Sequence, residues 1–344
     1  MTSIQLKAQA TPPSNGLGRI IKLLIVLAMF GAYEYFAVHT SPEVTRVAKS
    51  AADPPSTTCL DLQIDEDVKN RYRPTMQEHT KCLLYQEPSM YIKLVLNQVL
   101  GAPNHGRCDM ERGCKKHHLP YDAELRYYGN DWPPFGYTMI GRARLENLRA
   151  AIEEVNRNHI PGAIVELGVW RGGAMITAAA MGEEPGTTRR DVYLFDAFDA
   201  IPGYGGSVDF LENSIDDVRG NFEQFNLLMD NVHFEKGFFK DSLPKWKDRK
   251  DPIAVLRVDA NFYDSYQDAM YYLYENVPVG GIVIFDDVMT HKPVMRFWLD
   301  FKREQGLPEE LNRIDTHSAW FRKEKEIQLD FSKMHAPQDA NIVK

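Results

Sequence analysis

Acidic residues stand at or near the ends of four short apolar runs beyond residue 160 of this 344-residue chain. They are Glu166, Asp196, Asp259 and the pair Asp286-Asp287. A single carboxylate at such a place often only caps the helix that follows. Four acidic strand ends are harder to explain in this way. The carboxyl ends of parallel strands lie at one edge of the sheet, and ligands bind at that edge. We therefore predict a functional site at this edge.

The first acid lies in the turn VELGVWRGG, residues 165–173. Its pattern is neither the dinucleotide fingerprint G-x-G-x-x-G nor a P-loop, since no lysine follows Gly173. Glu166 would repel a phosphate but can hold a cation such as an α-ammonium group. Asp196, on the next predicted strand, is placed to accept hydrogen bonds from ribose hydroxyls. The turn therefore favours S-adenosylmethionine over NAD, with glycines that let the backbone approach the methionine tail.

The later acids suggest a metal ion. Asp259 precedes Asp286 and Asp287 by 27 and 28 residues, at the ends of successive predicted strands. If those strands pair, they lie about 4.8 Å apart, and their carboxylates can share one hard divalent cation such as Mg²⁺. Such a cation can bind an acceptor hydroxyl and lower its pKa. This chemistry predicts methyl transfer to a hydroxyl group.

Regular apolar spacing that could position these residues begins near residue 138. The predicted strands are Ala163–Leu167, Val192–Phe195, Val232–Glu235, Ile253–Val258 and Ile282–Phe285. The predicted helices are Arg142–Asn156, Gly172–Met181, Asp216–Leu228, Tyr266–Glu275 and Val294–Glu304, after a helix-like patch at Met90–Leu100. The alternation predicts an α/β fold with a doubly wound, mostly parallel sheet. Leu311–Asp315 and Ala319–Arg322 are expected to add a C-terminal antiparallel hairpin.

An apolar segment, Ile20–Val38, lies near the N-terminus. Nineteen helical residues span about 28 Å, close to the thickness of a bilayer core. Lys7, Arg19 and Lys22 lie before it or at its start, so the positive-inside rule places the N-terminus in the cytosol. We predict a single-pass anchor with a luminal domain. A cleaved signal peptide and a helix of a soluble protein remain alternatives, because the uncharged core has only 11 residues.

The four cysteines precede the α/β region, which is typical of disulfides in an exported, loop-rich segment. They are Cys59, Cys82, Cys108 and Cys114. A zinc site with the neighbouring histidines is the weaker alternative, because the chain has no C-x-x-C pair. The net charge of −8 and the lack of a dense basic face after residue 130 argue against nucleic-acid binding.

These observations divide the chain into six parts. They are a cytosolic tail (1–19), a transmembrane anchor (20–38), a stem (39–58), an irregular, disulfide-linked extension (59–136), a methyltransferase domain (137–330) and a C-terminal tail (331–344).

Five stretches carry a family resemblance: YTMIGRARLENLRAAIEEV, VELGVWRGG, LFDAFDAIPG, VRGNFEQFNLLMDNVHFEKGFFKDSLP and IAVLRVDANFYDSYQDAMYYLYENVPVGGIVIFDDV. In this order they resemble the macrocin O-methyltransferase (TylF/MycF-like) family over roughly residues 137–323. The resemblance implies a class I methyltransferase-like Rossmann fold that uses S-adenosylmethionine and Mg²⁺ to methylate sugar hydroxyls.

The resemblance also implies roles for individual residues. Glu166, Gly168 and Gly172 would lie at the methionine end of the cofactor, Asp196 at the ribose, and Gly237, Phe238 and Asp241 near the adenine. Asp259, Asp286 and Asp287 would be metal ligands, joined by Asn261, which stands where the family has a further acid. The family's loop histidine has no counterpart in residues 203–214. We therefore predict Asp259 and His291 as catalytic residues, with His317 as the alternative base.

Together the domain and the anchor predict a single-pass type II enzyme of the Golgi membrane that O-methylates hexoses of glycans in the lumen. Its expected partners are the glycan and, through the anchor, the membrane, with a homodimer as a possible assembly. Two alternatives remain: methylation of a lipid or phenolic small molecule, since fold does not fix substrate, and a non-catalytic protein, suggested by Asn261. Trp132 and Phe135, in the turn DWPPFG, could stack on a sugar ring or form a lid.

Overall fold

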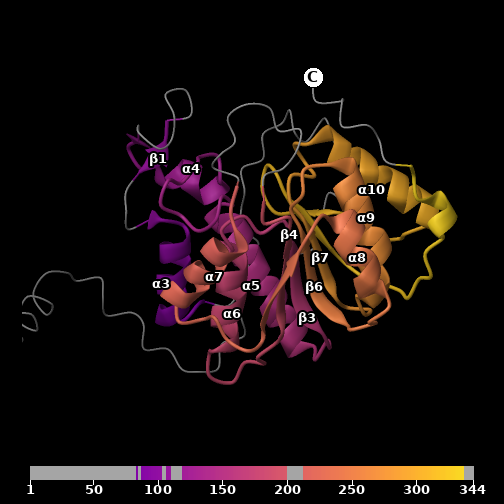
Figure 1. Cartoon of the computed structure of the whole chain (residues 1–344), viewed down its shortest axis with the longest axis horizontal. Coiled ribbons are helices and arrows are strands. Elements are labelled where there is room, and N and C mark those ends of the chain that lie inside the picture. The colour runs from indigo at the N-terminus through magenta and orange to yellow at the C-terminus, as the bar shows by residue number, and fades with distance from the viewer. Residues whose placement is uncertain (1–82, 84–86, 103–105, 110–117, 200–211, 337–344) are drawn as a thin grey trace, which may run out of the picture. The chain divides into compact units, whose positions relative to one another are not determined.

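The computed structural model describes residues 83, 87–102, 106–109, 118–199 and 212–336 (Figure 1). The predicted tail, anchor and stem lie outside these residues, as do Cys59, Cys82 and Cys114, so those domain boundaries and the disulfides remain predictions. Within the described residues, no helix is both long enough and apolar enough to cross a membrane.

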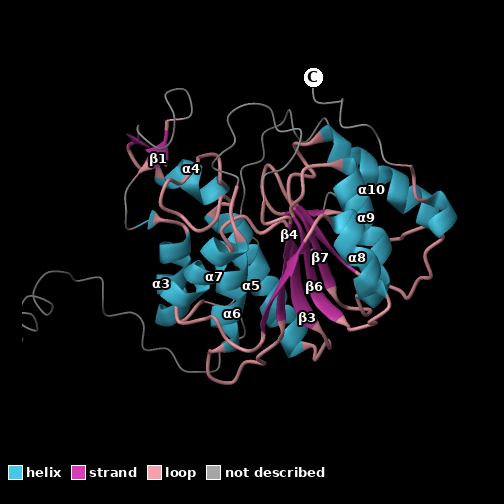
Figure 2. Cartoon of the chain, viewed as in Figure 1, coloured by secondary structure: helices cyan, strands magenta, loops and turns pink. Residues whose placement is uncertain are grey.

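Helices and strands alternate through most of the described chain (Figure 2). The helices are α3 (Met90–Val99), α4 (Ala123–Tyr128), α5 (Arg142–Arg157), α6 (Gly173–Gly182), α7 (Ile215–Gln224), α8 (Phe239–Lys247), α9 (Tyr263–Leu273) and α10 (Lys292–Gln305), with short 3₁₀ helices at Tyr274–Asn276 and Phe331–Lys333. The strands are β1 (Arg107–Cys108), β2 (His118–Leu119), β3 (Ala163–Leu167), β4 (Val192–Asp196), β5 (Val232–Lys236), β6 (Ile253–Val258), β7 (Ile282–Phe285), β8 (Asn312–Arg313) and β9 (Ala319–Arg322).

Seven strands form one sheet in the order β5-β4-β3-β6-β7-β9-β8. The first five are parallel, while β9 runs antiparallel to β7 and pairs with β8. The predicted parallel sheet and closing hairpin are thereby confirmed. The direction of winding reverses between β3 and β6, and doubly wound sheets bind ligands at such a switch point.

Helices cover both faces of this sheet, which gives three layers (Figure 1). One face packs against α5, α6 and α7, with α3 packed on α6, and the other face packs against α8, α9 and α10. Strands β3, β6 and β7 are buried along their whole length, as expected for a parallel sheet covered on both sides.

Local sequence explains where several helices begin and end. A capping box between Ser214 and Asp217 starts α7. Gly306, in the left-handed conformation, ends α10. Helix α8 was not predicted, because Pro244 lies inside it and proline normally interrupts a helix. Buried Leu243 and Trp246 pack its inner face against the sheet and offset that preference.

Candidate active site

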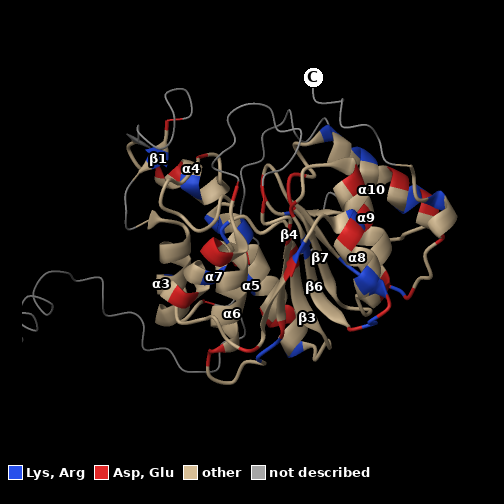
Figure 3. Cartoon of the chain, viewed as in Figure 1, with Lys and Arg blue, Asp and Glu red and all other residues tan. Residues whose placement is uncertain are grey.

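The carboxyl ends of the parallel strands meet at one edge of the sheet, which we call the carboxyl edge. Backbone hydrogen bonds continue there past the strands, from Gly168 N to Phe195 O (2.8 Å) and from Asp259 N to Leu167 O (2.8 Å). The structure brings together at this edge all the acids noted in the sequence: Glu166, Asp196, Asp259, Asp286 and Asp287. Acidic segments gather at the upper end of the sheet in Figure 3.

Glu166 is the buried acid of the first turn, with 2% of its surface exposed. Its Oε1 accepts a charged hydrogen bond from Arg257, whereas its Oε2 has no hydrogen-bond partner among the described residues. Burial raises the pKa of Glu166 to about 8, against the opposing effect of Arg257. An orphaned carboxylate oxygen in a buried site has unmet hydrogen-bonding capacity, which an ammonium group can fill.

The glycines of this turn are required by contacts within the protein. A Cβ on Gly168 would lie 1.9 Å from the carbonyl oxygen of Asp259, and one on Gly172 would lie 2.9 Å from Val218 Cγ1. Both glycines have φ near +84°, a conformation that other residues rarely adopt. Close packing of the turn against β6 and α7 therefore accounts for them, whereas the sequence had suggested an approach to the methionine tail.

Asp196 holds the same turn in place from the end of β4. Its carboxylate accepts hydrogen bonds from the backbone amides of Val169 (2.8 Å) and Phe198 (3.0 Å). Burial raises the pKa of Asp196, and these amide donors oppose the rise. The side chain thus fixes the turn that precedes α6.

Asp286 is the centre of a buried charge network. Its Oδ1 lies 2.6 Å from Arg144 Nη1, its Oδ2 is paired with Arg257, and the Ser318 hydroxyl donates to Oδ1. Arg144 also pairs with Asp315 at 2.9 Å. Burial alone would raise the pKa of Asp286, but the two guanidinium groups hold it well below its usual value.

Asp259 and Asp287 are the more accessible acids, with 24% and 19% of their side chains exposed. Burial and the charge of Asp286 raise their pKa values to about 8 and about 7. Asp287 and the neighbouring Asn261 both have positive φ, 56° and 61°. Asp and Asn adopt this left-handed conformation more readily than other residues that carry a side chain.

The predicted metal ligands divide into two kinds. Asp286 is engaged by two arginines, and in the described part of the chain no three His, Cys, Asp or Glu side chains form a group that could hold a metal ion. Asp259 and Asp287 are still compatible with Mg²⁺, which in proteins often takes only one or two carboxylates and fills its other positions with water and substrate oxygens. A divalent cation would also offset the negative charge that raises both pKa values.

Two histidines flank Asp287. Nδ1 of His291 and Nδ1 of His317 each lie 3.9 Å from Asp287 Oδ1. The ring of His317 is the better fixed, because its Nε2 lies 2.6 Å from Asn130 Oδ1 and its backbone amide donates to Asp315. Burial lowers the pKa of both imidazoles, which favours their neutral form.

The residues predicted near the adenine lie at the end of β5. Gly237 donates a backbone hydrogen bond to Asp196 O (2.9 Å), so it borders the turn described above. Phe238 precedes α8 with 44% of its surface exposed, and Asp241 is exposed in the first turn of that helix. The three residues line one side of the carboxyl edge.

Arg257 and Arg144, the two cations of the buried charge network around Asp286, were not predicted from the sequence. Arg257 interrupts the apolar strand IAVLRV two residues before Asp259. A fully buried strand with one charged residue is a usable signal, because buried charges are normally paired. Arg144 gave no such signal within an amphipathic helix that carries several other charges.

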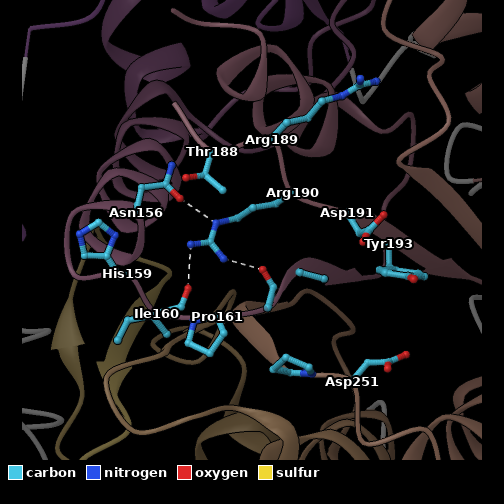
Figure 4. Close-up of a pocket in the computed structure, with 13 residues that line it drawn as sticks. Asn156, His159, Ile160, Pro161, Thr188, Arg189, Arg190, Asp191, Tyr193 and Asp251 are labelled. Carbon is cyan, nitrogen blue, oxygen red and sulfur yellow. Dashed lines mark hydrogen bonds between the residues drawn. The ribbon is translucent and has the colours of Figure 1, made fainter. Parts of the chain in front are cut away.

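A cavity of about 560 Å³ lies at the opposite, amino edge of the sheet (Figure 4). It is bordered by the end of α5 and the residues before β3, β4 and β6. The guanidinium of Arg190 is bound there by Asn156 Oδ1 (2.7 Å) and by the carbonyl oxygens of Gly162 (2.5 Å) and Ile160 (2.7 Å). These contacts join α5 to the sheet.

Comparisons with known proteins agree with this geometry. Residues 104–323 match the family model described as Macrocin-O-methyltransferase (TylF). The demethyldecarbamoylnovobiocin O-methyltransferase of Streptomyces niveus is 34% identical over 250 residues, which cover 69% of this chain and 94% of that protein. A methyltransferase of Streptomyces olivaceus, acting at the 4' hydroxyl of a rhamnosyl tetracenomycin, is 33% identical over 216 residues, 58% of this chain and 81% of that protein. The solved structure of the O-methyltransferase NovP superposes with a TM-score of 0.62 at 33% identity and covers 69% of this chain and 99% of its own.

The Golgi location predicted from the apolar N-terminal segment is wrong. These relatives, and a mycinamicin III 3''-O-methyltransferase of Micromonospora griseorubida, come from bacteria, which have no Golgi apparatus. The prediction combined the sugar methyltransferase resemblance with an anchor at Ile20–Val38, and that segment lies outside the described residues.

Proposed function

The chain belongs to the macrocin O-methyltransferase family and is an S-adenosylmethionine-dependent O-methyltransferase, and we propose that its acceptor is a sugar hydroxyl of a glycoside. One observation carries the proposal. The turn after β3, which suits the methyl donor, lies at the same sheet edge as two accessible carboxylates, those of Asp259 and Asp287. The printed names of two relatives support the acceptor class, because one acts on a rhamnosyl group and another at a 3'' position.

The donor side of the site is the turn after β3. We assign Glu166, Gly168 and Gly172 to the methionine end, where the unpaired Oε2 of Glu166 can accept from the α-ammonium group. Asp196 is assigned to the ribose, and Gly237, Phe238 and Asp241 to the adenine. When bound, S-adenosylmethionine supplies a methyl group activated by a positively charged sulfur.

The acceptor side is formed by Asp259 and Asp287. These carboxylates can hold the acceptor hydroxyl in line with the methyl group, so that the O–CH₃ bond forms as the S–CH₃ bond breaks. The hydroxyl proton then passes to a nearby base, for which Asp259 and His291 are our first assignments and His317 is the alternative. The imidazoles are neutral and can accept a proton near neutral pH, and Asp259, with a pKa of about 8, can do so at mildly alkaline pH where it is ionised.

We further propose that Asp259 and Asp287 bind a divalent cation, with the amide oxygen of Asn261 and the carboxylate of Asp286 as additional candidate ligands. A bound cation would lower the pKa of the acceptor hydroxyl. Calorimetric titration of Mg²⁺ into the full-length chain, and into an Asp287→Asn variant, tests this without any assay of activity. We expect binding to the wild type and weaker binding to the variant, and equal heats would contradict the assignment.

The whole proposal is tested by incubating the full-length chain with labelled S-adenosylmethionine and a panel of 4-nitrophenyl hexosides and deoxyhexosides. We expect label on a sugar oxygen, located by mass spectrometry of the product. Label only on a lipid or on the phenolic ring of an aglycone control would overturn the sugar assignment. Calorimetry with Glu166→Ala and Asp196→Ala separately measures donor binding, which both changes should weaken.

A further inference from the structure

Two exposed aromatic side chains, Trp132 and Phe135, lie in the segment NDWPPFGY, residues 130–137. Trp132 is 37% exposed and Phe135 is 49% exposed, while Pro133 between them is buried. Exposed aromatic groups close to polar residues of a site are typical of surfaces that bind ligands. The position of this segment therefore needs an explanation.

One end of the segment reaches the catalytic acids. Asn130 Oδ1 lies 2.6 Å from Nε2 of His317, which flanks Asp287. The next residue, Asp131, forms a buried ion pair with Arg126 at 3.1 Å. These contacts hold the start of the segment beside the acceptor side of the carboxyl edge.

The other end reaches the donor turn. Nη1 of Arg171, which lies in that turn, donates to the carbonyl oxygens of Pro134 (3.2 Å) and Gly136 (2.9 Å), on either side of Phe135. Gly173 N donates to the carbonyl oxygen of Tyr137 (2.8 Å). The segment thus spans from the acids to the donor, and the two aromatic residues lie between its anchors.

Arg171 is unusual for a half-buried arginine. It forms no ion pair within the described ranges, although its guanidinium carbon lies 4.2 Å from the ring centre of Trp170. Burial lowers its pKa, so its position is maintained at an electrostatic cost. Its two hydrogen bonds to backbone carbonyls connect the donor turn to the aromatic segment, whatever side chains that segment carries.

We propose that Trp132 and Phe135 form the surface on which the acceptor glycoside stacks, and that Arg171 is a positioning residue that holds this surface against the donor turn. The inference rests on the proposed sugar acceptor. Aromatic faces pack against the C–H faces of sugar rings and against flat aglycones, and they contribute specificity without charge. The arrangement separates recognition of the acceptor from binding of the donor.

The experiment compares Trp132→Ala, Phe135→Ala, Arg171→Lys and Arg171→Met with the wild type, using the 4-nitrophenyl glycoside that the wild type methylates fastest. We expect each aromatic variant to raise the acceptor KM about three- to tenfold, with the calorimetric Kd for S-adenosylmethionine within twofold of the wild type. Arg171→Met should lower kcat/KM for the acceptor by about tenfold or more, and Arg171→Lys should recover part of the loss. Leu299→Ala, on α10 with 39% exposure, is the matched control and should change neither constant.

Unchanged acceptor KM in both aromatic variants would overturn this inference and leave the sugar methyltransferase intact. A wild type that methylates no glycoside would instead overturn the proposed function, and this inference with it. Thermal unfolding identifies any variant that fails to fold. If Arg171→Met is one of these, the Arg171→Lys and aromatic variants decide the outcome.

Discussion

The two edges of the central sheet hold an arginine in opposite ways, a buried one at the carboxyl edge and a half-buried one at the amino edge. At the carboxyl edge, Arg257 pairs with three carboxylates, those of Glu166, Asp259 and Asp286. At the amino edge, Arg190 is surrounded by uncharged oxygens, the side-chain amide of Asn156 and backbone carbonyl groups. Both guanidinium groups are well provided with hydrogen bonds, yet only the first sits in excess negative charge.

This difference distinguishes a reactive site from a structural joint. Carbonyl oxygens accept the hydrogen bonds of a guanidinium group without shifting the pKa of any neighbouring group. Clustered carboxylates do the reverse, since they add to the effect of burial and raise the pKa values of Glu166, Asp259 and Asp287 toward neutrality. Strongly perturbed carboxylates in an accessible site mark chemistry more often than stability. The cavity at the amino edge is therefore a poorer guide to function than the charge distribution.

The largest expected effect is on catalysis at the carboxyl edge. Asp259→Asn keeps the shape of the side chain but removes the carboxyl group that can accept the hydroxyl proton, so we expect kcat for methyl transfer to fall by about 10²- to 10⁴-fold. The matched control is Asp251→Asn at the amino edge, where Asp251 lines the cavity and pairs with Arg249. Initial rates at saturating donor measure both. Equal losses in the two variants would remove the proposed distinction between the edges.

The second effect is on stability at the same edge. Arg257→Met leaves Glu166 and Asp286 buried without one of their cations, and breaking a buried ion pair costs about 3–5 kcal/mol. We expect the free energy of unfolding to fall by that amount, measured by urea denaturation at pH 7. A change below about 1 kcal/mol would show that Arg144 alone can neutralise the network.

The third effect is the counterpart at the amino edge. Arg190→Met leaves the Asn156 amide and the carbonyl groups of Ile160 and Gly162 without their donor, which costs about 1–3 kcal/mol. Because these groups lie at the far end of the strands, we expect kcat and the donor Kd to remain at wild-type values. A fall in kcat with an unchanged melting temperature would assign a function to the amino edge.

The smallest effect tests whether a raised pKa alone marks a site. Burial, and then the charge of Asp264, raise the pKa of Asp268 on α9 from 3.8 to about 6. A carboxyl whose pKa is higher in the folded state stabilises the fold below about pH 4, and that contribution is lost as the pH rises through about 6. Asp268→Asn should therefore melt at a higher temperature than the wild type at pH 7.5, with the difference reduced or reversed at pH 4. Its rate of methyl transfer should not change, and a large fall would make Asp268 part of the site.

Much of this architecture could be read from the sequence, because burial leaves a direct signature. The bounds of β3, β6 and β7 were predicted to the residue, since each is a short, mostly apolar run bounded by glycine, proline or acidic residues. Helix α8 was missed, because tertiary packing overrides the local preference of Pro244.

The site was predictable only in part. Strand topology brings the acids together, and this follows from the alternation of elements. Which acids form ion pairs with the arginines depends on three-dimensional contacts. The ion pairs of Asp286 with Arg144 and Arg257 could therefore not be predicted from the sequence. The role of Arg171 was hidden for the same reason, because its partners are backbone carbonyls that leave no trace in the sequence.

The contact between Gly168 and the carbonyl oxygen of Asp259 has a consequence for how such enzymes diversify. A methyl group has no room at residue 168, so the main chain of the donor turn rests directly on the main chain that carries Asp259. The spacing between the turn after β3 and the backbone of Asp259 is therefore set by main-chain contact and does not depend on side-chain rotamers. A library that randomises Trp132 and Phe135 can explore new acceptors while this distance stays constant. Natural selection has the same freedom, so a change of acceptor need not impair the chemical step.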